Sequence, residues 1–116
     1  MEEYAQRNEI LITLGFRDYK AYGRSELWKS IRARKLAIDP NCYVCERGDT
    51  EAKIQVHHGQ YHENNLTGKT LDDLWTLCAA HHHWIEITVK GFKRNPEDAT
   101  KEMFRIRKQW LAMHRS

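Results

Sequence analysis

Apolar residues near both ends of the chain recur at the spacing of helices. Residues 2–14 predict a first helix, and Ser25 can cap a second one that continues to Ile38. Near the C-terminus, Asn95 can cap a final helix with Pro96 at its first position. The apolar positions that support this last helix are Met103, Ile106, Trp110 and Met113. Helical segments therefore enclose a central stretch of different character.

The central stretch combines apolar runs with loop residues. Ile54 and Val56 alternate with polar neighbours, which predicts a strand over residues 53–57. The run Leu-Trp-Thr-Leu at 74–77 is short enough for a second strand, and the stretch 59–69 has the composition of a loop. A helix is expected from about residue 79 to residue 90, and Gly91 can end it.

The length of 116 residues predicts one domain. We expect this domain to comprise a helical N-terminal segment (1–40), a central metal-binding segment (41–90) and a C-terminal helix (91–116). Hydrophobic residues make up 41%, which allows only a small core, and small domains often need an internal cross-link or metal. No apolar run reaches about 18 residues, and the acidic start lacks a signal-peptide pattern. We therefore expect an intracellular, cytoplasmic protein without a membrane span.

Three cysteines and seven histidines are the most informative part of the composition. The odd cysteine count argues against a disulfide framework, and nine of these ten residues lie between Cys42 and His83. Two pairs of residues have the spacing of ligands that bind one metal ion: Cys42 with Cys45, and Cys78 with His81. They predict a structural Cys₃His zinc site. The alternative is a redox role for the first pair, with Cys78 as an ordinary buried thiol.

Three further histidines are not used by this zinc site. His57 and His58 are adjacent at a predicted strand end, where neighbouring side chains point in opposite directions. One of them can therefore bind a metal while the other faces a substrate. His82 follows His81 on a helix and is rotated from it by about 100°, so it can face a second centre. The histidines that we interpret as loop or surface groups are His62, His83 and His114.

The order of these motifs resembles the HNH endonuclease family: Cys-x-x-Cys, then His-His, then Leu-x-x-Leu-Cys-x-x-His-His, with SELWKSIRARKL before them. The resemblance covers about residues 25–86. It implies an α+β fold with a ββα-metal core, a structural zinc and flanking helices. It also implies that His58 is the general base that deprotonates water and that His57 and His82 bind a catalytic metal. Short proteins of this kind occur in phages and mobile elements, which implies a bacterial or phage-infected host.

The chain departs from the family pattern at several ligand positions. His81 stands where the family usually has a cysteine, and Asp73 stands at the position of the central asparagine, nine residues before His82. Glu86, four residues after His82, matches a further ligand of some members. The carboxylates of Asp73 and Glu86 favour Mg²⁺ or Mn²⁺ as the catalytic cation, with Zn²⁺ and Ni²⁺ as alternatives. The nearby asparagines, which lie at a different spacing, are Asn64 and Asn65.

The net charge of +3 conceals an uneven distribution. Residues 1–40 carry 8 basic and 6 acidic side chains, residues 41–89 carry 3 and 7, and residues 90–116 carry 8 and 3. An acidic centre between basic helices suits cations beside a phosphate backbone, so DNA is the expected partner. The residues predicted to contact the DNA backbone are Arg24, Lys29, Arg32, Lys35, Lys93, Arg94, Lys101, Arg105 and Lys108. Basic helix faces that merely solvate the surface are the alternative.

Two functions are compatible with these residues. The first is a metal-dependent DNA endonuclease that hydrolyses phosphodiester bonds, with His58 as the base and a divalent cation on the scissile phosphate. Its catalytic set would be His57, His58, Asp73 and His82. The second is a catalytically inactive, zinc-stabilised nucleic-acid-binding or regulatory module, which the altered Asp73 and Glu86 favour. The intact histidine pair favours the endonuclease, and the oligomeric state stays open, with a dimer as one option.

Overall fold

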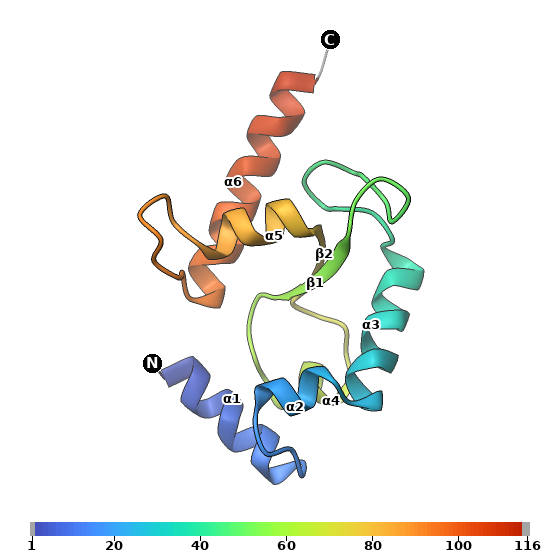
Figure 1. Cartoon of the computed structure of the whole chain (residues 1–116), viewed down its shortest axis with the longest axis vertical. Coiled ribbons are helices and arrows are strands. Elements are labelled where there is room, and N and C mark those ends of the chain that lie inside the picture. The colour runs from blue at the N-terminus through green and yellow to red at the C-terminus, as the bar shows by residue number, and fades with distance from the viewer. Residues whose placement is uncertain (1, 115–116) are drawn as a thin grey trace.

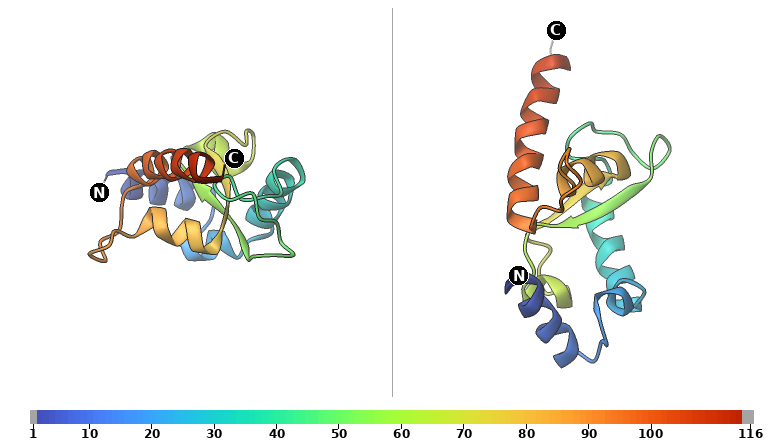
Figure 2. Two further views of the ribbon diagram at one scale, coloured as in Figure 1. Left: turned by 90° about the horizontal axis from the view of Figure 1, so that it is seen from above. Right: turned by 60° about the vertical axis from the view of Figure 1, so that its left-hand side comes forward.

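The computed structural model describes residues 2–114 as six helices and a two-stranded antiparallel sheet (Figure 1). The helices are α1 (Glu2–Thr13), α2 (Tyr19–Gly23), α3 (Glu26–Ile38), α4 (Glu63–Thr67), α5 (Ala79–Glu86) and α6 (Pro96–His114). The strands are β1 (Ile54–His58) and β2 (Leu74–Cys78). α1, α2 and α4 gather at one end, the sheet lies in the middle, and α5 with α6 forms the other end, as Figure 2 also shows. The mixed α+β class is therefore confirmed.

Both predicted strands form. β1 begins and ends one residue later than predicted, and β2 extends one residue further at its C-terminal end. β1 pairs with β2 so that His57 lies opposite Trp75 and His58 lies opposite Leu74. Ile54 and Val56 are buried, as the alternating pattern requires. Because only two strands pair, the sheet depends on helices packed against it, and α3 and α5 both contact it.

The N-terminal helices follow the predicted caps, with one addition. The hydroxyl of Ser25 accepts a hydrogen bond from the Trp28 amide at 3.1 Å, which confirms Ser25 as the N-cap of α3. The added helix is α2, which sequence analysis did not identify and which Asp18 caps through the Ala21 amide. A separate core cluster holds these helices to α4, and its fully buried members are Leu11, Tyr22 and Leu66. Ile38, the last residue of α3 as predicted, is 66% exposed.

The helix predicted over 79–90 ends early, at Glu86. Residues beyond it turn into a short hairpin in which Ile87 pairs with Lys93 across an isolated β-bridge. Gly91, with φ of 87°, lies in the turn of this hairpin, so its predicted role as a helix stop was wrong. Ile87 and the two β-branched residues after it favour extended backbone over helix, which explains the early end.

The largest core cluster lies between the metal-ligand segment, α5 and α6. Its α6 members are Ala99, Met103 and Ile106, and Ile85 of α5 packs with them. The cap predicted for α6 is confirmed, because the Asn95 side chain accepts a hydrogen bond from the Asp98 amide at 2.8 Å. Within the part of the chain that is described, no helix combines the length and the apolar character needed to cross a membrane.

Candidate metal group and histidine pocket

Cys42, Cys45, Cys78 and His81 converge where the 42–45 turn meets the first turn of α5. All four are buried, and their ligand atoms lie within 4.8 Å of one another. The Sγ atoms of Cys45 and Cys78 are 3.9 Å apart, and Cys78 Sγ is 3.3 Å from His81 Nδ1. A tetrahedral ion with Zn–S bonds of about 2.3 Å requires sulfur atoms about 3.8 Å apart. The group could therefore hold a structural metal ion such as zinc, as the spacing predicted.

Burial, hydrogen bonds and charge shift the pKa values of this group in different directions. The guanidinium of Arg47 donates to Cys45 Sγ at 3.2 Å and lies 3.8 Å from Cys78 Sγ. Burial raises the pKa of Cys42 to about 11. Burial opposes ionisation of Cys45 too, but the Arg47 hydrogen bond and backbone donors outweigh it, so the pKa of Cys45 is lowered. Burial, followed by Arg47, lowers the pKa of His81, which keeps its imidazole neutral for ligation.

A second feature is a pocket of about 150 Å³ beside β1 and α5. Three of the four residues predicted for catalysis line it, namely His57, His58 and His82. Glu86 lines it as well, one helical turn after His82. Tyr19, Tyr61 and Lys93 are among its other lining residues. Segments distant in the sequence therefore bring the histidine pair, a helical histidine and a carboxylate to one site.

His58 packs against two aromatic rings. The Trp28 ring centroid is 4.9 Å from that of the imidazole, and the Tyr61 ring stacks at 5.0 Å. The Tyr19 hydroxyl is 3.4 Å from Nδ1, whereas Nε2 is buried and has no hydrogen-bond partner among residues 2–114. Burial, with smaller contributions from Arg7 and other histidines, lowers the pKa of His58 to about 3. The imidazole is therefore neutral at pH 7, with one ring nitrogen left for a ligand or water.

His57 and His82 face each other across the junction of β1 and α5, with ring centroids 5.5 Å apart. His57 Nε2 contacts the Thr100 hydroxyl at 3.0 Å, and His82 Nδ1 contacts Gln55 Oε1 at 2.7 Å. The other ring nitrogen of His82 lies 3.1 Å from Glu86 Oε1. Burial lowers the pKa of His57 to about 3 and lowers that of His82, although Glu86 opposes the second shift. Neutral imidazoles are the form that binds metal ions.

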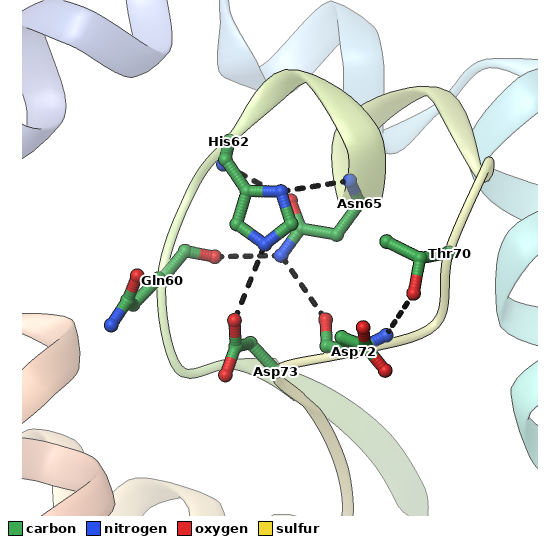
Figure 3. A network of polar contacts seen from close by, with 6 residues as sticks. All are labelled: Gln60, His62, Asn65, Thr70, Asp72 and Asp73. Atoms are coloured by element: carbon green, nitrogen blue, oxygen red, sulfur yellow. Dashed lines mark hydrogen bonds and ion pairs between the residues drawn. The ribbon is translucent and has the colours of Figure 1, made fainter.

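Asp73 does not join these histidines. Its backbone is left-handed, with φ of 61°, and its carboxylate lies 3.2 Å from His62 Nε2 in the loop between the strands (Figure 3). It is not among the residues that line the histidine pocket. The predicted pairing of Asp73 with His57 and His82 around one cation is therefore not seen in this arrangement, and Glu86 supplies the carboxylate at the pocket.

Asn65 holds the loop between β1 and β2 together. Its fully buried side chain donates to the backbone oxygens of Gln60 and Asp72, at 2.9 and 3.4 Å, and accepts from the His62 amide at 3.1 Å (Figure 3). The His62 ring in turn accepts from the Asn65 amide, so the two residues form a reciprocal cap of α4. His62, interpreted from the sequence as a loop polar group, thus has a defined structural position.

Most of the basic residues predicted to grip DNA are paired within the protein. Arg32 donates to the Ile54 carbonyl at 2.7 Å, and Arg94 donates to the Trp84 and Ile85 carbonyls at 3.1 Å. Four others form ion pairs with acidic neighbours: Lys29, Lys35, Lys101 and Arg105. Within residues 2–114, the three whose side chains form no hydrogen bond or ion pair are Arg24, Lys93 and Lys108, and the Lys93 ammonium lies over the Tyr4 ring. Lys93 is the one of these that borders the histidine pocket.

Comparison of this chain with protein-family models, with curated proteins and with solved structures gave no match. The geometry therefore carries the functional argument. Sequence reasoning did not identify Tyr19 or Thr100, which reach the histidine pair from 39 and 43 residues away. Gln55 could have been found, because it lies two residues before His57 and therefore on the same face of β1.

Proposed function

We propose that this protein is a metal-dependent endonuclease that hydrolyses phosphodiester bonds in DNA, with β1, β2 and α5 as a ββα-metal core of the HNH type. The observation that carries the proposal is the convergence of His57, His58, His82 and Glu86 on one pocket. Phosphodiester cleavage needs a base that deprotonates water and a cation on the phosphate. This set contains a histidine that can act as the base and three side chains that can bind the cation.

His58 would be the general base. When the Tyr19 hydroxyl accepts a hydrogen bond from Nδ1–H, the lone pair of His58 resides on Nε2, the atom without a partner in the described chain. That nitrogen can then take a proton from the attacking water. The packed rings of Trp28 and Tyr61 would limit rotation of the imidazole, which keeps the base oriented before substrate arrives.

His57, His82 and Glu86 would hold the catalytic cation. Thr100 engages Nε2 of His57 and Gln55 engages Nδ1 of His82, which fixes both rings. Nδ1 of His57 is then left to bind the cation, and Nε2 of His82 faces Glu86, with which it would share the cation. The Glu86 carboxylate is a hard oxygen ligand, which favours Mg²⁺ or Mn²⁺. Such an ion, when bound, would polarise the scissile phosphate and stabilise the leaving oxygen.

A structural zinc at the Cys₃His group would position this pocket. His81 and His82 are adjacent on α5, so an ion held by His81 and the three cysteines would fix the first turn of the helix that carries His82. Binding free energies of structural zinc are about 10 kcal/mol or more, which is comparable to the whole stability of a small domain. The zinc would therefore support both folding and the geometry of the pocket.

The surroundings of the pocket suit a polymeric phosphate substrate. Lys93 is exposed at its rim and lies over the Tyr4 ring at 5.2 Å. A second hollow of about 330 Å³ shares Tyr61 and Pro96 with the pocket, so the two hollows adjoin. A substrate longer than one phosphate group can extend from one into the other.

A second function has its own support. Among the described residues, the Cys₃His group is the only cluster of three or more potential ligands whose atoms all approach within 4.8 Å. The set at the histidine pocket is looser, and the His58 side chain is only 4% exposed. These features favour the alternative, a zinc-stabilised nucleic-acid-binding or regulatory module without catalysis.

Cleavage of supercoiled plasmid DNA with Mg²⁺ or Mn²⁺ tests the proposal. We expect His58→Ala, with its zinc content confirmed, to lose cleavage by about 100-fold or more. His83→Ala is the matched control, because His83 lies on α5 but is exposed and outside the pocket. Full activity of His58→Ala would contradict the mechanism. DNA binding by the unmodified protein without cation-dependent cleavage would instead support the inactive module.

A further inference from the structure

The segment between α5 and α6 forms a braced hairpin that projects from the body of the protein (Figures 1 and 2). We call residues 87–93 the 87–93 hairpin. Ile87 pairs with Lys93, and the Thr88 amide donates to the Phe92 carbonyl at 2.8 Å. The Thr88 hydroxyl accepts from the Phe92 amide at 3.0 Å, and Gly91 closes the turn with a positive φ. The hairpin thus has a defined shape that holds its tip away from the core.

The tip of this hairpin is apolar and its flanks are basic. Val89 is 105% exposed and Phe92 is 69% exposed, so neither side chain contributes to folding by burial. Lys90 lies between them in the sequence and Lys93 follows, and the stretch from Ile87 to Asn95 contains no acidic residue. A single exposed apolar residue needs no explanation, but two at a braced tip with only positive charge beside them require one.

The root of the 87–93 hairpin is fixed to the histidine pocket. Lys93 and the following Arg94 both line the pocket. The Arg94 amide donates to the Glu86 carbonyl at 2.6 Å, and its guanidinium caps the last carbonyls of α5. These bonds tie the hairpin to the helix that carries His82 and Glu86. A phosphate held in the pocket would therefore bring its neighbouring nucleotides to the tip.

We propose that the 87–93 hairpin is a wedge that inserts Phe92 between neighbouring base pairs of the bound DNA, with Val89 against the groove. This proposal rests on the proposed function. Proteins that bend DNA often insert such apolar side chains from the minor groove while cations contact the adjacent phosphates. Lys90 and Lys93 are placed for the second task. A protein partner fits less well, because stable interfaces bury about 1,200 Å² or more and two side chains offer far less.

The test uses the full chain carrying His58→Ala, which prevents cleavage, with zinc content confirmed. The probe is a DNA duplex with 2-aminopurine at successive positions, since this base brightens when it is unstacked. We expect bright signals at one or two adjacent positions, and about tenfold or greater loss of affinity with loss of the signal on adding Phe92→Ala. Phe92→Trp should retain both. The control is Ile38→Ala, because Ile38 is equally exposed at 66% but lies on α3.

Each outcome bears on a distinct claim. Binding of the parent protein without brightening at any position, or Phe92→Ala binding as well as the parent, would overturn the wedge while leaving the endonuclease proposal in place. Failure of the parent to bind duplex DNA at all would contradict the proposed function and the wedge together. Phe92-dependent binding to anionic phospholipid vesicles, with DNA binding independent of Phe92, would assign the tip to a membrane surface and overturn the proposal.

Discussion

The Tyr19 hydroxyl lies 3.4 Å from His58 Nδ1, although the two residues are 39 positions apart in the chain. Tyr19 belongs to α2, a helix of five residues whose N-cap is Asp18. Burial raises the pKa of Tyr19 well above its ordinary value, so its hydroxyl stays protonated and can accept from or donate to the imidazole. This contact connects the N-terminal helices to the residue that we propose as the general base.

Replacing Tyr19 with phenylalanine should lower the rate of DNA cleavage. The ring would keep its packing against Tyr22 and Tyr61, but the imidazole of His58 would lose the hydroxyl that contacts Nδ1. We expect kcat to fall about tenfold with KM unchanged, because base orientation acts on the chemical step. The control is Tyr43→Phe, since Tyr43 packs against Trp75 away from the pocket. A rise in KM at constant kcat would argue that Tyr19 contacts substrate instead.

Removing the metal from the Cys₃His group should unfold the domain. We expect about one zinc per chain by elemental analysis, and loss of the cooperative thermal transition after treatment with a strong chelator. Cys45→Ser should have the same effect without chelator, since Cys45 Sγ is one of the four ligand atoms. His62→Ala, which removes a histidine outside the group, should retain its zinc. An unchanged melting curve in chelator would rule out a structural metal.

The asparagine pair in the loop between the strands offers a matched test of stability. Asn65→Ala should lower the free energy of unfolding by about 2 kcal/mol, because two backbone carbonyls and one amide lose their buried partner. Asn64→Ala should change it by less than about 0.5 kcal/mol, because Asn64 is exposed. Urea denaturation of both variants measures the difference. Equal effects of the two substitutions would show that Asn65 does not hold the loop.

The two candidate carboxylates should differ in their effect on the catalytic cation. Glu86→Gln should raise the Mn²⁺ concentration needed for half-maximal cleavage about tenfold or more, because Glu86 lines the pocket beside His82. Asp73→Asn should leave that concentration nearly unchanged, since its carboxylate contacts His62. Titration of cleavage with Mn²⁺ distinguishes the two variants. The reverse ranking would place Asp73 at the catalytic cation.

Local features of the sequence were sufficient for much of this protein. Ser25 and Asn95 cap helices as expected, because capping depends on one side chain and the next few amides. The first strand followed from alternation and the second from a short apolar run, and the metal group followed from two pairs of ligands at a spacing that one ion can bridge. The separation of His81, in the metal group, from His82, at the histidine pocket, followed from helix geometry, since adjacent residues differ by about 100°.

Only the tertiary structure decided which distant groups meet these residues. No local pattern brings Tyr19 to His58 or Thr100 to His57, because such contacts depend on how separate helices pack around β1. The left-handed backbone of Asp73 turns its carboxylate toward His62, a direction that ligand spacing does not reveal. The pairing of Ile87 with Lys93 exists only once the 87–93 hairpin has closed, so the sequence pattern did not predict it. The sequence determined the chemistry available, and packing determined which groups share a site.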